Sequence, residues 1–118
     1  MAMMYFDKII ETDAASRKRG EVMTQRELID RLSAAKNDLK RKFGIEQIAL
    51  FGSYARNEAN EESDVDIAIL KMNLKSGFDV VRAQNYLQNY LEMDVDLGTF
   101  GSMKSFVKRK IEKDFIYV

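Results

Sequence analysis

The chain has 118 residues, enough for one domain with a hydrophobic core of its own. Its 19 lysines and arginines balance 19 aspartates and glutamates, so no overall attraction to nucleic acid or to a membrane is expected. Cysteine and histidine are both absent, which excludes disulfides, Cys/His zinc sites, thiol nucleophiles and histidine-dependent triads and leaves oxygen ligands for a metal. No apolar stretch approaches the length of a membrane span and no secretory signal is evident, so we expect a cytoplasmic protein.

The first 22 residues differ in pattern from the rest of the chain. Apolar residues recur there at helical spacing: Met3, Phe6, Ile9 and Ile10. Small and charged residues follow, as in a linker or a frayed helix end. We therefore divide the chain into an N-terminal helical extension or arm, residues 1–22, and a domain, residues 23–118. Packing of the extension on the domain is the favoured arrangement, with partner binding and disorder as alternatives.

A helix is expected near the start of the domain. Thr24 to Glu27 has the sequence of a capping box, in which the threonine caps the helix and the glutamate reaches back to it. Apolar residues then recur at helical spacing: Leu28, Leu32, Ala35, Leu39 and Phe43. The basic run Lys40–Lys42 favours the helix dipole in the last turn, and Gly44 ends the helix. In a neutral chain, this run is expected to be a solvated face rather than a nucleic-acid patch.

The most informative stretch follows this helix. A short apolar run, Glu46 to Phe51, ends on Gly52-Ser53, which predicts a strand that leads into a tight turn. Tyr54 to Ala59 could form one or two helical turns. Arg56 lies where it could reach a triphosphate, and the alternative is a surface ion pair with a nearby glutamate. The three glutamates in reach are Glu58, Glu61 and Glu62.

The next segment combines a strand pattern with two carboxylates. Asp64 to Leu70 alternates with a period of two, which predicts a strand with Asp64 and Asp66 on one face, roughly 6.5 Å apart at their roots. Like charges at that separation repel, and Mg²⁺ relieves the repulsion, since it takes one or two carboxylates together with substrate phosphates. Gly52 lets the backbone approach a phosphate, and the Ser53 hydroxyl can hold its oxygens. Together these groups suit phosphoryl or nucleotidyl transfer.

Helix and strand patterns continue to alternate in the last part of the chain. Asp79–Leu91 reads as an amphipathic helix, and Leu91–Leu97 (LEMDVDL) alternates like a third strand. A last helix is expected over Ser102–Lys113, and a short strand or a partner-docking tail over Phe115–Val118. The inward residues of that helix would be Met103, Phe106, Val107 and Ile111. This order predicts an α/β (α+β) fold with a small mixed β-sheet flanked by helices.

Taken singly, Gly-Ser and Ser-Asp-x-Asp are common turn sequences, so a structural role is the alternative for each. Their combination is rarer: Gly52-Ser53, ten residues, then Asp64-x-Asp66 resembles the signature of the minimal nucleotidyltransferases of the DNA polymerase β-like superfamily. The longer text GSYARNEANEESDVDIAI is close to that family's GS-x-ARGEA-x-x-x-SD-x-D pattern. Asn57 stands where the family usually has glycine, and asparagine tolerates a left-handed backbone. The resemblance extends from about Thr24 to the C-terminus and implies a nucleotidyltransferase fold.

The resemblance also implies a third acidic residue on a later strand. The apolar-Asp-apolar pattern fits Asp96 best, with Asp94 as the alternative and two solvent-facing edge-strand charges as the structural interpretation. By resemblance, Asp64 and Asp66 would hold two Mg²⁺ ions. Asp96 would complete one metal site and orient or deprotonate the attacking hydroxyl.

The activity that the resemblance implies is Mg²⁺-dependent transfer of AMP, or another nucleoside monophosphate, from ATP to a hydroxyl. Small single-domain members are typically antitoxins encoded beside a HEPN-domain ribonuclease toxin, and they are thought to adenylylate a tyrosine near its active site. We therefore expect ATP and a HEPN toxin from a neighbouring gene as partners, without direct contact to nucleic acid or membrane, and an oligomer is possible. The alternatives are an antitoxin that blocks its partner by contact alone and a nucleotidyltransferase acting on a small molecule.

Overall fold

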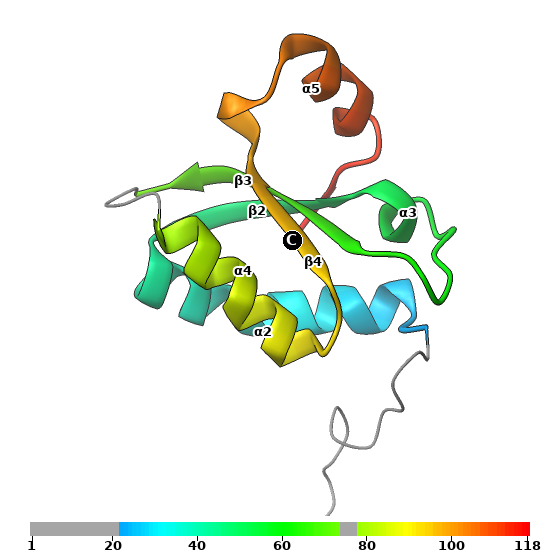
Figure 1. Cartoon of the computed structure of the whole chain (residues 1–118), viewed down its shortest axis with the longest axis horizontal. Helices are drawn as coiled ribbons and strands as arrows, with labels where there is room; N and C mark the ends of the chain where they lie inside the picture. The colour runs from blue at the N-terminus through cyan, green and yellow to red at the C-terminus, as the bar shows by residue number, and fades with distance from the viewer. Residues whose placement is uncertain (1–21, 74–77) are drawn as a thin grey trace, which may run out of the picture.

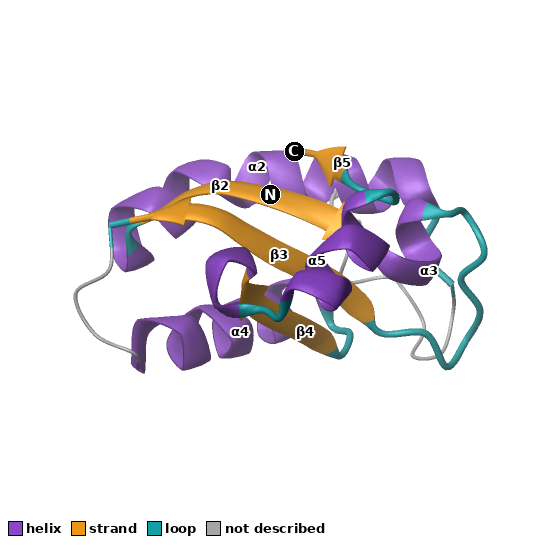
Figure 2. Cartoon of the chain, turned by 90° about the horizontal axis from the view of Figure 1, so that it is seen from above, coloured by secondary structure: helices purple, strands orange, loops and turns teal. Residues whose placement is uncertain are grey.

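The computed structural model describes residues 22–73 and 78–118, so all but the last residue of the expected N-terminal helical extension, 1–22, lies outside the described residues. One four-stranded sheet forms the centre of the domain, with α2 and α4 covering one of its faces (Figures 1 and 2). The elements, in chain order, are α2 (Gln25–Phe43), β2 (Ile45–Phe51), α3 (Gly52–Ala55), β3 (Val65–Met72), α4 (Phe78–Leu91), β4 (Val95–Thr99), the 3-10 turn η1 (Phe100–Ser102), α5 (Ser105–Glu112) and β5 (Ile116–Tyr117).

The sheet is mixed, as the alternation of helices and strands predicts. Its strand order is β4-β3-β2-β5. β2 runs antiparallel to both β3 and β5, whereas β3 and β4 are parallel and are joined by a crossover through α4. The C-terminal segment is therefore a strand of the sheet, one of its two expected states. Within residues 22–73 and 78–118 no helix is long and apolar enough to cross a membrane.

α2 forms as its sequence predicts. The Thr24 side chain accepts from the Glu27 N–H at 3.0 Å, and the Thr24 N–H donates to the Glu27 carboxylate at 2.9 Å. Gly44 ends the helix with φ 72°, the left-handed conformation that favours glycine. The five apolar residues expected on one stripe are all buried against the sheet.

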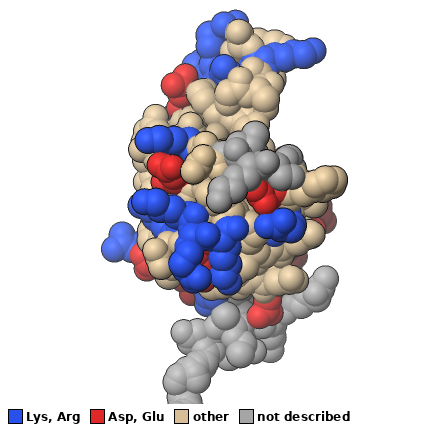
Figure 3. All heavy atoms as spheres, turned by 90° about the vertical axis from the view of Figure 1, so that its left-hand side faces the viewer, with Lys and Arg blue, Asp and Glu red and all other residues tan. Residues whose placement is uncertain are grey.

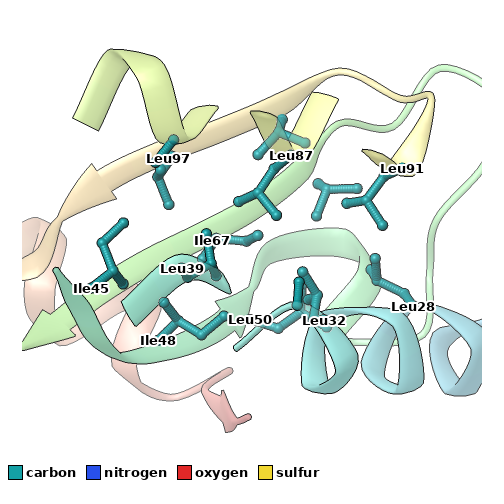
Figure 4. Packing of buried hydrophobic residues seen from close by; sticks show 14 of the residues in the cluster. Leu28, Leu32, Leu39, Ile45, Ile48, Leu50, Ile67, Leu87, Leu91 and Leu97 are labelled. Carbon is teal, nitrogen blue, oxygen red and sulfur yellow. The ribbon is translucent and has the colours of Figure 1, made fainter. Parts of the chain in front are cut away.

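The hydrophobic core fills the space between α2, α4 and the covered face of the sheet (Figure 4). In β3 the inward residues are Val65, Ile67 and Ile69, each at most 2% exposed. α4 meets them with Ala83, Leu87 and Leu91. Because successive strand residues point to opposite faces, the residues between these positions are directed to the other side of the sheet. The core thus determines which face of the sheet carries Asp66.

The third strand begins later than expected. Leu91 is the last residue of α4, and β4 starts at Val95 and extends to Thr99, so the predicted range Leu91–Leu97 was wrong in both bounds. Two glutamine side chains of α4 bind the backbone of β4: Gln88 accepts from the Val95 N–H at 3.1 Å, and Gln84 accepts from the Leu97 N–H at 3.0 Å. These contacts satisfy backbone donors of an edge strand, which would otherwise be open to another chain.

α5 is the element whose packing differs most from the expectation. The helix is shorter than the predicted Ser102–Lys113, because it spans only Ser105–Glu112 and Ser102 belongs to η1. None of its residues is buried, and Phe106, expected to point inward, is 63% exposed. The reason is its position: α5 projects from the side of the sheet opposite α2 and α4 (Figure 1). A second layer of helices to bury its apolar stripe is absent from the described part of the chain.

Candidate active site

Two strands bring the candidate carboxylates together. In the parallel pairing of β3 with β4, Asp66 is the register partner of Asp96. Their strand neighbours Ile67 and Leu97 are buried in the core, so both aspartates belong to the face that α2 and α4 leave open. Asp64 is exposed and immediately precedes β3, which begins one residue later than predicted. The sequence had placed Asp66 and Asp96 on separate strands, and their pairing is a finding of the structure.

The three acidic groups act on one another electrostatically. The pKa of the half-buried Asp66 carboxyl is raised from 3.8 to about 6. Burial is the largest cause, followed by the charges of Asp96 and Asp64, while Arg56 acts in the opposite direction. Asp96, the register partner of Asp66, thus acts on this carboxyl together with Asp64. A cation placed here would relieve this repulsion.

Gly52 lies directly against the Asp66 carboxylate. Its φ of 77° lies in the left-handed region, and a Cβ at this position would overlap Asp66 Oδ2. Any other residue would therefore have to push the carboxylate away as well as strain the backbone. Asn57 adopts φ 60°, so asparagine accommodates the turn where the related pattern has glycine.

The helical turn after β2 starts earlier than expected. α3 spans Gly52–Ala55 and not the expected Tyr54–Ala59, so the glycine is its first residue. The Arg56 N–H donates to the Gly52 carbonyl at 3.0 Å, and the Glu58 N–H donates to the Ser53 carbonyl at 2.8 Å. The Tyr54 side chain, 1% exposed, anchors the turn in the core. Ser53 therefore lies in the same turn as the glycine that contacts Asp66.

Arg56 takes part in an ion-pair network at the edge of the site. Its Nε donates to the Glu58 carboxylate at 2.9 Å. This is one of the surface ion pairs that the sequence offered as the alternative to triphosphate binding. Its Nη1 donates to Asp114 at 2.8 Å, a partner 58 residues away that no local pattern indicates. The network connects the turn after α3 to the segment between α5 and β5. A nucleotide-binding role for Arg56 stays a prediction.

One further contact at this site lacks a sequence signal. Gln25 lies inside the capping box that begins α2, yet its side-chain amide donates to the carbonyls of Tyr54 at 2.9 Å and Ala55 at 3.0 Å. The sequence assigned Gln25 no role beyond its place in the helix. Contacts over 29 and 30 residues are long-range, so local propensity does not predict them.

The chemistry of the donors fits a hard cation such as Mg²⁺. Asp66 and Asp96 are adjacent carboxylates whose repulsion is not neutralised, and Asp64 adds to it. Within the described ranges, no three carboxylates already converge on one metal position. Mg²⁺ needs no such cage, because it is commonly held by one or two carboxylates, waters and substrate phosphates. The arrangement therefore fits a metal that binds together with a triphosphate.

Charge is unevenly distributed in this neutral chain. Lysine and arginine side chains gather over the end of the molecule where α2 finishes, as Figure 3 shows. The last turn of α2 contributes Lys40, Arg41 and Lys42 to that end. The opposite end, near α3, holds the acidic connection to β3. Its acidic residues are Glu58, Glu61, Glu62 and Asp64.

Comparison with known proteins identifies the class. Residues 32–118 match the family model described as the nucleotidyltransferase domain, and the chain belongs to that family. It is 35% identical over 97 residues to the protein adenylyltransferase MntA of Thermococcus cleftensis. This match covers 82% of this chain and 98% of that protein. It is 43% identical over 96 residues to a Methanocaldococcus jannaschii protein whose name gives the same activity provisionally, with 80% of this chain and 98% of that protein covered.

Solved structures share the fold. A structure of a protein assigned as a minimal nucleotidyltransferase matches with a TM-score of 0.68 and 26% identity, over 80% of this chain and 95% of that chain. A chain from the complex of a tri-AMPylated Shewanella oneidensis HEPN toxin with an MNT antitoxin matches with a TM-score of 0.55 and 22% identity. The second match covers 80% of this chain and 71% of that chain, and at this identity it supports the fold alone. The mixed sheet with flanking helices is the minimal nucleotidyltransferase fold.

Proposed function

We propose that this chain transfers AMP from ATP to a hydroxyl of a partner protein. The observation that carries the proposal is the pairing of Asp66 with Asp96 on the open face of the sheet, with the backbone of Gly52 against the Asp66 carboxylate. Relatives named protein adenylyltransferases, which this chain matches over almost their whole length, support AMP as the transferred group and a protein as the acceptor.

The acceptor in this proposal is a tyrosine of a HEPN-domain toxin from a neighbouring gene, and the chain acts as its antitoxin in the cytoplasm. The matching solved complex of an MNT antitoxin with a tri-AMPylated HEPN toxin suggests this partner. The open face of the sheet suits it, because α5, the helix on that side, has no buried residue and leaves Asp66 half-buried and Asp96 exposed.

Each candidate residue has a role in the proposed reaction. The Gly52 and Ser53 turn holds oxygens of the triphosphate, and Arg56 reaches it after leaving its ion pairs. Asp64, Asp66 and Asp96 would hold two Mg²⁺ ions, which would neutralise charge on the triphosphate.

The reaction itself is a substitution at phosphorus. Asp96 accepts the proton of the acceptor hydroxyl as that oxygen bonds to the α-phosphorus of ATP. The bond from the α-phosphorus to the oxygen bridging to the β-phosphate breaks, and pyrophosphate leaves. The products are an adenylylated partner and pyrophosphate.

The test combines the full chain with the HEPN-domain product of the neighbouring gene, ATP and Mg²⁺. Intact-mass spectrometry should detect one or more added AMP groups on the partner and none after chelation of the metal. Asp66→Asn and Asp96→Asn should abolish the addition, whereas Asp94→Asn, an exposed residue of the same sequence motif, should retain it. A stable complex whose mass never changes, with ATP, GTP or CTP, would refute transfer and indicate an antitoxin that acts by contact.

A further inference from the structure

The one-turn helix α3 cannot hold its shape by itself. A helix of four residues is far shorter than the roughly 12 residues at which isolated helices become marginally stable, so its conformation depends on contacts with the rest of the domain. Its end carries two carbonyls, of Tyr54 and Ala55, that α3 does not satisfy internally. The Asn57 N–H reaches the first of them at 3.2 Å. The Gln25 side chain reaches both.

The Gln25 amide is chemically matched to this task. An amide nitrogen carries two hydrogens, and here one nitrogen serves two carbonyl oxygens at 2.9 and 3.0 Å. The orientation of the amide is determined by these partners, because its oxygen would repel both carbonyls. The capping box of Thr24 and Glu27 fixes the backbone from which the side chain extends. The donor is therefore held on a rigid element.

The other end of the same turn is the candidate nucleotide site. Gly52 is the first residue of α3 and contacts the Asp66 carboxylate, and Ser53 follows it. The four residues of α3 form a single hydrogen-bonded turn, so a shift at Ala55 moves Gly52 and Ser53 with it. Displacements of about 1 Å can reduce a reaction rate about 100-fold. Gln25 is thus placed to set the distance between the turn and the carboxylates.

We propose that Gln25 is a positioning residue for the nucleotide site, acting through α3. This inference rests on the proposed nucleotidyl transfer and adds a residue that lies before the region matched by the family model, residues 32–118. Gln25 touches neither substrate nor metal in this scheme. Its amide holds the carbonyl end of α3, and thereby the Gly52 and Ser53 end, at a fixed place beside Asp66.

The experiment compares Gln25→Leu, Gln25→Glu and Gln25→Lys in the full chain. Leucine removes both donors at similar volume, glutamate replaces them with acceptors that repel the carbonyls, and lysine restores donors. We expect Gln25→Leu and Gln25→Glu to weaken binding of Mg²⁺-ATP about tenfold and to slow transfer about tenfold to 100-fold, with the affinity for the partner protein unchanged. Gln25→Lys should recover part of both losses.

A matched control separates positioning from loss of stability. Lys36→Gly weakens the same helix at an exposed position roughly 16 Å along the helix axis from Gln25. It should lower the unfolding temperature while leaving ATP binding and the transfer rate within twofold of the original chain. If the Gln25 variants lose ATP binding only as much as Lys36→Gly does, the effect is structural and the proposal is wrong.

Amide hydrogen exchange gives a readout that does not depend on transfer. The N–H groups of Arg56, Asn57 and Glu58 donate to carbonyls of the α3 turn. Their exchange should be faster in Gln25→Leu and unchanged in Lys36→Gly. Unchanged exchange in Gln25→Leu would overturn the inference even if the chain proves active. Faster exchange in a chain that never transfers AMP would instead count against the proposed function.

Discussion

The two faces of the sheet are made from the same strands but have different roles. Ile67 of β3 is completely buried among the residues of α2 and α4, and its neighbour Asp66 lies half-buried on the opposite face beside Asp96. Burial of the Ile67 side chain stabilises the folded chain. Burial is also the largest cause of the raised pKa of Asp66, about 6. The apolar burial on the covered face therefore stabilises the fold. This stability allows like charges to be held together on the open face.

The largest effect is expected on the covered face. Ile67→Ala leaves a cavity among tightly packed residues and should lower the free energy of unfolding by about 3 kcal/mol. Urea denaturation measures the change, with an unchanged m-value if the unfolded state is unaffected. The exposed Val81, on the outer side of α4, is the matched control: Val81→Ala should change stability by less than about 0.5 kcal/mol. A loss below about 1 kcal/mol for Ile67→Ala would mean that the core collapses around the vacancy.

A glycine substitution on the open face should have the next largest effect. Gly52→Ala introduces both a clash with the Asp66 carboxylate and a strained left-handed backbone, which together should cost about 2 kcal/mol. It should also abolish transfer, because the carboxylate has to move. Gly101→Ala is the control, since no atom lies within 4 Å of the added methyl group. Similar stability losses in both variants would contradict the close contact between Gly52 and Asp66.

The pH dependence of stability tests the raised pKa of Asp66, which burial and, after it, the charges of Asp96 and Asp64 produce. With a pKa of about 6 in the folded chain and an ordinary value of 3.8, Asp66 binds more protons when folded than when unfolded between these pH values. The free energy of unfolding should therefore fall as the pH rises from about 4 to about 6 and then level off. Because the carboxyl is only half-buried, solvent screening limits the effect to about 1 kcal/mol.

Asp66→Asn should remove this fall. Above about pH 7 the variant should be more stable than the original chain by about 1 kcal/mol while losing transfer activity. Denaturation curves across the pH range, for both proteins, provide the measurement. Asp94→Asn serves as the control and should keep the pH profile of the original chain. If Asp66→Asn is no more stable at neutral pH, the combined cost of burying the ionised Asp66 carboxyl and of its repulsion by Asp96 and Asp64 has been overestimated.

Local patterns predicted the covered face well. The capping box at Thr24 and the stripe through Leu32 gave α2 with its caps, because helix ends and buried stripes depend on residues close in sequence. The motif around Asp66 likewise predicted the strand that carries this residue. The pairing of Asp66 with Asp96, and the contacts of Gln25 and Asp114, join residues 29 to 58 positions apart. Such contacts depend on the register of the assembled sheet, which no local pattern contains.

The smallest effect is expected at α5, where a helical stripe has no cover. Leu32 of α2 and Phe106 of α5 both lie on apolar stripes, but the first is 0% exposed and the second 63%. Phe106→Ala should change the free energy of unfolding by less than about 0.5 kcal/mol, against 2 to 5 kcal/mol for Leu32→Ala. The same denaturation assay compares the two variants. A loss above about 1.5 kcal/mol for Phe106→Ala would show that α5 packs more closely on the sheet in solution, and would extend the stabilising layer to the face that carries Asp66.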